Sequence, residues 1–251
     1  MADSSGVVER DEAVDVRPAG ERFHTVASWL DSWHSFSFGG HHDPSNTHHG
    51  LLLVNNEDVI APGGGFGEHP HRDMEIVTWV LRGELLHRDS TGGEGVIYPG
   101  LAQFMRAGTG IRHSEMNASA TADVHVVQMW APPGRRGLAP GYEQRDVSDV
   151  LAAGGLVAVA AGPGGAADAA LAIDTPGTTL WAVRLGAGAS AAVPDAPRAH
   201  LFVALGGLEL EPGTALGAGD AARLSDAGTR RITAGNEGAE VLLWVTPAAL
   251  A

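Results

Sequence analysis

The chain has 251 residues, which suffices for one large domain or for two domains of ordinary size. Its formal net charge of −14 repels phosphate backbones and anionic membranes, so we expect no direct binding to nucleic acid and no membrane association. Cysteine is absent, which excludes disulfides and leaves His, carboxylates and carbonyls as the groups able to hold a metal. No apolar run is long enough to span a bilayer.

The N-terminal segment carries no structural pattern. Residues 1–20 are polar and lack periodicity, which predicts a loose tail. The segment has neither the basic start nor the apolar core of a signal peptide, so we expect a cytoplasmic protein.

The following part of the chain predicts short strands separated by glycine-containing turns. The strand candidates are apolar or β-branched runs at Leu51–Val54, Glu75–Leu81, Leu85–Asp89 and Asp123–Trp130. Alternation along the last of these runs places His125 on the same face as Val127 and Met129. Short strands at regular spacing with glycine turns predict an all-β barrel or jelly roll.

The second half of the chain differs in composition but keeps the same pattern. From about residue 150 it is rich in Ala and Gly, yet Leu180–Leu185, His200–Leu205 and Val241–Val245 still predict strands. It contains a single histidine, His200, and no histidine pair. We therefore expect a second small β-barrel without a metal site.

Two short pairs of metal-binding residue types mark the first half. His69 and His71 follow a glycine-rich run, and His113 and Glu115 follow a second one. Residues i and i+2 of a strand point to the same face, so each pair projects two ligands from one strand. If the two strands face each other inside a barrel, three imidazoles and one carboxylate converge on one ion. Such a set suits a divalent first-row metal.

A second histidine cluster is a weaker metal candidate. It comprises His41, His42, His48 and His49. Adjacent side chains on an extended segment point apart, and no carboxylate stands at ligand spacing, so we interpret this segment as a loop.

The residues around the two pairs resemble a known family. One segment resembles the first cupin signature, Gly, five residues, His-x-His, three or four residues, Glu, at Gly63, His69, His71 and Glu75. Another resembles the end of the second signature, Gly-x-x-His-x-x-x-Asn, at Gly110, His113 and Asn117. More specifically, residues 25–146 are similar to bacterial pirins, and the second half shares only the pattern of strands and turns.

The resemblance implies a bicupin, in which two antiparallel jelly-roll β-barrels pack face to face. We expect a metal-binding barrel at residues 21–145 and a barrel without metal at residues 146–251. The ligands implied by the family are His69, His71, His113 and Glu115. Glu75 ligates in many other cupins but not in pirins, so we assign it to orienting a ligand or to a structural role.

The resemblance also implies an activity. Several bacterial pirins are similar to dioxygenases that cleave quercetin and release carbon monoxide, so we expect a small aromatic substrate and dioxygen. Iron(II) is the metal we expect first, with manganese, nickel, cobalt, copper or zinc as alternatives. Glu115 is the catalytic candidate, because it either stays a ligand or accepts the proton of the flavonol 3-hydroxyl.

Two further residues are candidates around the metal. Phe66 is a candidate for a wall of the substrate pocket, and the alternative is an ordinary core aromatic. His125 is a candidate for the inner face of the barrel, where it could orient a ligand, and the alternative is a core histidine whose hydrogen bonds are satisfied. The alternative function is a redox-responsive regulator that acts through a protein partner. We expect a monomer.

Overall fold

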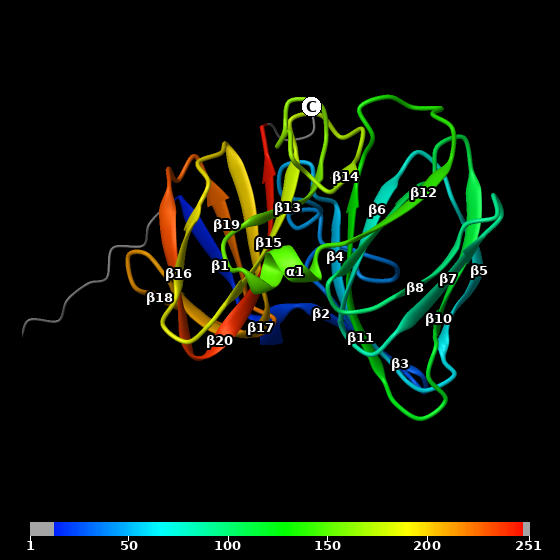
Figure 1. Ribbon diagram of the computed structural model, residues 1–251, viewed down its shortest axis with the longest axis horizontal. Coiled ribbons are helices and arrows are strands. Elements are labelled where there is room, and N and C mark those ends of the chain that lie inside the picture. Colours follow the sequence, from blue (N-terminus) through cyan, green and yellow to red (C-terminus); the bar gives the residue numbers. More distant parts are fainter. Residues whose placement is uncertain (1–12, 248–251) are drawn as a thin grey trace, which may run out of the picture.

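The computed structural model describes residues 13–247 and is built almost entirely from strands (Figure 1). The strands form three sheets, of seven, four and nine strands. Pairing is antiparallel in almost every ladder, and the contact between β13 and β14 is parallel. Within residues 13–247, no helix is long and apolar enough to cross a membrane.

The seven-stranded sheet is the middle layer of the molecule. Its strands, in spatial order, are β12 (Gly141–Asp146), β9 (Leu101–Arg106), β6 (Glu75–Arg82), β11 (Val124–Ala131), β4 (Val54–Ile60), β3 (Leu30–His34) and β2 (Phe23–Ala27). Strands β6 and β11 are rich in β-branched and aromatic residues, which suit a pleated surface that is buried on both faces.

The four-stranded sheet carries the two metal-binding pairs. It contains β5 (Gly65–His71), β10 (Ile111–Asn117), β7 (Leu85–Asp89) and β8 (Glu94–Ile97). Figure 1 shows this sheet at the edge of the molecule farthest from the last strands of the chain. The first half is thus two sheets that face each other, rather than one continuous closed barrel.

The nine-stranded sheet contains the whole second half of the chain. It consists of β1 (Val14–Arg17), β13 (Val157–Ala161), β14 (Leu171–Ala172), β15 (Thr179–Leu185), β16 (Ser190–Val193), β17 (Arg198–Leu210), β18 (Thr214–Gly217), β19 (Ala221–Ser225) and β20 (Arg230–Thr246). Two short helical turns, η1 (Ala19–Glu21) and α1 (Ser148–Ala152), lie at the passages between the sheets. We propose that the halves divide after β12, near residue 146.

Alternation along β6 and β11 gives the middle sheet two different faces. Trp79 and Met129 point into a core that they share with Phe202 and Trp244 of the second half. Thr78 and Gln128 are cross-strand partners on the opposite face, and both contact Glu115 of the four-stranded sheet. The candidate site therefore lies between the two sheets of the first half, while the second half supports the middle sheet from behind.

Two local predictions are wrong. Residues 14–17 were expected in a loose tail but form β1, which pairs with β19. That partner is about two hundred residues away in the chain, so no local pattern reveals it; residues 1–12 lie outside the described part. Leu51 and Leu52 are not in a strand but in a turn closed by hydrogen bonds between His49 and Leu52. Their apolar character reflects burial rather than a ladder.

Candidate metal centre

Three imidazoles come together on strands β5 and β10. These strands are antiparallel neighbours, and His113 is the direct cross-strand partner of His69. The ring centroids are 4.4 Å apart for His69 and His113, 4.9 Å for His71 and His113, and 4.8 Å for His69 and His71. One ring nitrogen from each lies within 4.8 Å of the other two. Local i, i+2 alternation on two paired strands is sufficient to produce this cluster.

Glu115 joins the cluster through His113. It forms a second group with His113 and His87, whose ligand atoms also lie within 4.8 Å of one another. The amide of Gln128 donates to both carboxylate oxygens of Glu115 at 2.9 Å, and Thr78 Oγ1 lies 3.5 Å from one of them. Burial raises the pKa of Glu115 to about 7, although the hydrogen bonds from Gln128 and Thr78 act in the opposite direction.

The donor atoms of the cluster fit a divalent metal. Nε2 of His71 and Nε2 of His113 are buried and have no hydrogen-bond partner. His69 Nδ1 lies 2.8 Å from the Gly67 carbonyl oxygen, which fixes the proton on Nδ1 and leaves Nε2 as a lone pair. Burial, aided by the neighbouring imidazoles, lowers the pKa of His71 to about 4 and that of His113 further still. Neutral imidazoles with unused lone pairs are the form that binds a metal.

A buried chain of polar groups continues behind His113. Its Nδ1 lies 3.4 Å from Nδ1 of His87, and His87 Nε2 lies 3.1 Å from Asp89 Oδ2. The side chains of His87 and Asp89 are fully buried, and Tyr142 stacks on His87 with 4.4 Å between ring centroids. If His113 offers Nε2 to a metal, its Nδ1–H donates to His87, and His87 Nε2–H donates to Asp89. The chain thus selects the ligating tautomer of His113.

Sequence reasoning missed this row of buried polar groups, because neither His87 nor Asp89 was among the candidate residues. The signal was present, since His87 and Asp89 have the same i, i+2 spacing as the two metal-binding pairs. Strand β7 pairs with β10, so that His87 faces Glu115 and Asp89 faces His113.

A cavity of about 310 Å³ opens in front of the cluster, between the two sheets of the first half. His69, His71 and Glu115 line it, so the cluster is accessible to a ligand of small-molecule size. Phe66 lies in the cavity wall and packs edge-on against Trp29, with 5.2 Å between ring centroids.

A row of polar residues crosses the inner face of the middle sheet. Each member is the cross-strand partner of the next, and the row runs through His34, Asn56, Gln128, Thr78, Gln103 and Gln144. The sequence shows Thr78, Gln103 and Gln128 each as a single polar residue between apolar neighbours, but only the strand register reveals that they lie side by side.

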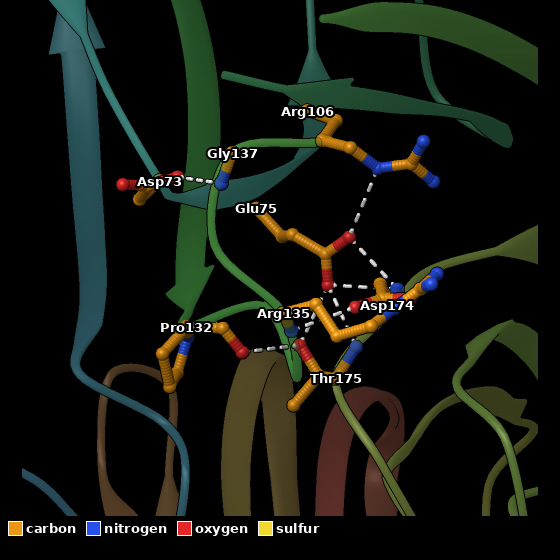
Figure 2. A network of polar contacts seen from close by, with 8 residues as sticks. All are labelled: Asp73, Glu75, Arg106, Pro132, Arg135, Gly137, Asp174 and Thr175. Carbon is orange, nitrogen blue, oxygen red and sulfur yellow. Dashed lines mark hydrogen bonds and ion pairs between the residues drawn. The ribbon is translucent and has the colours of Figure 1, made fainter. Parts of the chain in front are cut away.

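Glu75 faces Asp174 and Thr175 in the second half of the chain (Figure 2). Its carboxylate accepts the backbone N–H of Asp174 at 2.8 Å, and the backbone N–H and hydroxyl of Thr175 at 2.8 and 2.7 Å. Arg106 Nε lies 3.4 Å from the same carboxylate. Of the two roles that the sequence left open for Glu75, these contacts support the structural one.

His125 does not line the cavity, contrary to expectation. Its Nε2 lies 2.8 Å from Glu57 Oε1, and Glu57 in turn pairs with Arg22. The reason is the alternation of β11, in which Val127 and Met129 point into the core shared with the second half. His125 lies on the same face of β11 as Val127 and Met129, and Gln128 lies on the face that lines the cavity.

Comparisons with known proteins agree with this geometry. The Pirin family model matches residues 15–131. A Mycobacterium tuberculosis protein provisionally named quercetin 2,3-dioxygenase is 57% identical over 231 residues, which cover 92% of this chain and 94% of that protein. The Escherichia coli K12 quercetin 2,3-dioxygenase is 51% identical over 130 residues, or 52% of this chain and 56% of that protein.

The fold is also that of solved pirin structures. The crystal structure of YhhW from Escherichia coli has a TM-score of 0.85 and 36% identity, and the match covers 95% of this chain and 100% of that one. A complex of the same bacterial pirin with nickel(II) matches with the same TM-score over 94% of this chain. The chain therefore belongs to the pirin family.

Proposed function

We propose that this protein is a metal-dependent dioxygenase that cleaves flavonols such as quercetin with release of carbon monoxide. The observation that carries the proposal is a cluster of three imidazoles, two with buried and unpaired Nε2 atoms, that opens into a cavity with aromatic walls. The names of the relatives support the same reaction class.

The proposed ligands are His69, His71, His113 and Glu115. Iron(II) is the metal we propose first, and the nickel(II) complex of the related pirin keeps nickel among the alternatives, beside manganese, cobalt, copper and zinc. A bound metal would supply Lewis acidity, which lowers the pKa of a coordinated substrate hydroxyl.

The residues of the chain have separate tasks in this proposal. Phe66 and Trp130 line the cavity and hold a planar ring system in front of the imidazoles. Glu115 either ligates or accepts the 3-hydroxyl proton, and Gln128 fixes its carboxylate for both roles by donating to both oxygens. We extend the proposal to a cytoplasmic monomer.

The test is turnover of quercetin by protein reloaded with one metal at a time. Loss of the flavonol absorbance in air and release of carbon monoxide would be followed together. His69→Ala and Glu115→Ala should abolish both signals, whereas His42→Ala should not, because His42 is exposed and lies outside the cavity. Metal-loaded protein that leaves quercetin intact with every metal of the series would refute the dioxygenase. A stoichiometric protein partner that dissociates on metal removal would then favour the regulator.

A further inference from the structure

The cavity has a polar wall opposite the imidazoles. His34 on β3 is the cross-strand partner of Asn56 on β4, and Ser32 is the partner of Asp58 two positions along. All four line the cavity, and none exposes more than 4% of its surface. The imidazoles and Glu115 belong to the four-stranded sheet, whereas this polar wall belongs to the seven-stranded sheet. A ligand between the sheets therefore contacts the imidazoles on one side and the polar wall on the other.

Two atoms of this wall lack a partner. Nδ1 of His34 and Oδ1 of Asn56 are buried and have no well-formed hydrogen bond. Burial lowers the pKa of His34, and the nearby Asn56 side chain only partly opposes that effect. By contrast, Ser32 and Asp58 satisfy each other, since the serine hydroxyl donates to the carboxyl group. A buried polar atom without a partner is costly, so a group that enters the cavity and pairs with both atoms gains affinity.

The chemistry of the two atoms identifies that group. Asn56 Oδ1 only accepts, so the ligand must offer an O–H or N–H donor. His34 Nδ1 donates or accepts according to whether Nε2, which lies 3.0 Å from Thr25 Oγ1, carries the proton. A hydroxyl donates and accepts, and a pair of adjacent hydroxyls serves both atoms in either tautomer. An anion cannot donate to Asn56, and it would lie beside two carboxyl groups, Asp58 and Glu115.

The surface between the two polar sides is aromatic. Trp130 contacts His71 edge-on, with 4.9 Å between centroids, and contacts Phe38 in the same way at 5.5 Å. Phe66 lines the cavity beside the imidazoles. An extended planar ring system can therefore reach from the imidazoles to His34 and Asn56.

We propose that Asn56 and His34 form a subsite for a phenolic hydroxyl at the end of the ligand remote from the imidazoles. The preferred substrates are then flavonols that carry a hydroxyl on an outer ring, in addition to the 3-hydroxyl. This inference rests on the proposed function, because it assumes that a flavonol occupies the cavity.

Binding without turnover tests the subsite. Nickel(II)-loaded protein would be titrated under nitrogen with quercetin and with 3-hydroxyflavone, which has no outer-ring hydroxyl, by quenching of tryptophan fluorescence. Wild-type protein should bind quercetin about tenfold more tightly. Asn56→Leu and His34→Phe should weaken the binding of quercetin by about tenfold and leave the affinity for 3-hydroxyflavone within about twofold of wild type. His42→Phe, outside the cavity, serves as the matched control.

The outcomes separate the two proposals. Equal affinity of wild-type protein for both flavonols would overturn the subsite and leave the dioxygenase intact, because water would then be satisfying the two atoms. An equal loss of affinity for both flavonols in the variants would also overturn the subsite, because that pattern indicates damage to the fold or to the imidazole cluster. If neither flavonol binds wild-type protein, the proposed function falls and the subsite falls with it. The wild-type comparison requires no variant, so a misfolded variant does not remove the test.

Discussion

Replacing Glu75 with glutamine should destabilise the protein without weakening its metal site. The carboxylate receives three hydrogen bonds of 2.7–2.8 Å from Asp174 and Thr175 of the second half, and its side chain is 1% exposed. In one amide orientation the new NH₂ group faces the N–H and the hydroxyl of Thr175. In the other it replaces the oxygen nearest Arg106, and the N–H of Asp174 can still donate to the remaining oxygen, which lies 2.9 Å away. The new NH₂ group is then itself a buried donor that faces two other donors. At least one buried donor is therefore left without an acceptor in either case.

The magnitude follows from those contacts. One buried unpaired donor costs about 1–3 kcal/mol, and weakening the remaining charge-assisted bonds adds about 1 kcal/mol, so we expect a loss of about 2–4 kcal/mol. The free energy of unfolding of typical domains is about 5–15 kcal/mol, so a urea titration should resolve this loss. Glu68→Gln is the control, because Glu68 is exposed and its pair with Arg112 is worth less than about 1 kcal/mol.

The assay has a second part that separates structure from metal binding. Nickel affinity, measured in competition with a chelator, should stay within about twofold in Glu75→Gln at low urea, since no contact joins Glu75 to the imidazoles. A stability change below about 0.5 kcal/mol would refute the reasoning about the unpaired donor. A tenfold loss of nickel affinity in the folded variant would show that Glu75 orients a ligand after all.

Three further predictions concern other parts of the molecule. His87→Phe removes the acceptor of His113 Nδ1–H, and nickel affinity should fall about 10–100-fold in the chelator assay. Gly65→Ala should lower the midpoint of thermal unfolding by several degrees. A Cβ at this position would clash with the Glu115 carbonyl oxygen, and the φ of +153° is strained for any residue other than glycine. Burial lowers the pKa of His49 from 6.5 to about 4, so the unfolded state binds a proton that the folded state does not. Stability should fall as pH drops from about 6.5 towards 4, and His49→Gln should reduce that slope in urea titrations at several pH values.

Each of these predictions has a contrary result. Unchanged nickel affinity in His87→Phe would mean that His113 keeps its tautomer without the buried chain. An unchanged midpoint in Gly65→Ala would mean that β5 and β10 can separate to admit a methyl group. A pH slope equal to that of the parent protein in His49→Gln would assign the proton uptake to other buried imidazoles, such as His200.

The sequence was sufficient wherever the determining pattern is local. Two i, i+2 pairs place their side chains on one face of a strand, so the pattern predicted that the two pairs could meet. We expected strands that face each other across a barrel, whereas β5 and β10 are paired neighbours in one sheet. The pattern that predicted strand β7 is also local, and the bounds of that strand, Leu85–Asp89, match the prediction. Glycine turns and β-branched runs likewise indicated an all-β chain.

The sequence was insufficient wherever a partner is distant. The polar row depends on the register of six strands, and a shift of one residue would send every member to the other face. The donors of Asp174 and Thr175 that bind the Glu75 carboxylate are about one hundred residues away from it in the chain. The role of His87 depends on β7 lying beside β10, which the sequence alone does not fix.

Strand β6 explains why the carboxylate that ligates in many other cupins has another task here. Alternate residues of β6 serve opposite sides of the middle sheet. Glu75 binds the loop at Asp174, and Trp79 donates to Glu240 of the second half at 2.7 Å. Thr78, between them in the chain, contacts Glu115 from the other face. The second half therefore holds the strand that supports the candidate site from behind, and contributes to that site without supplying a residue to the imidazole cluster.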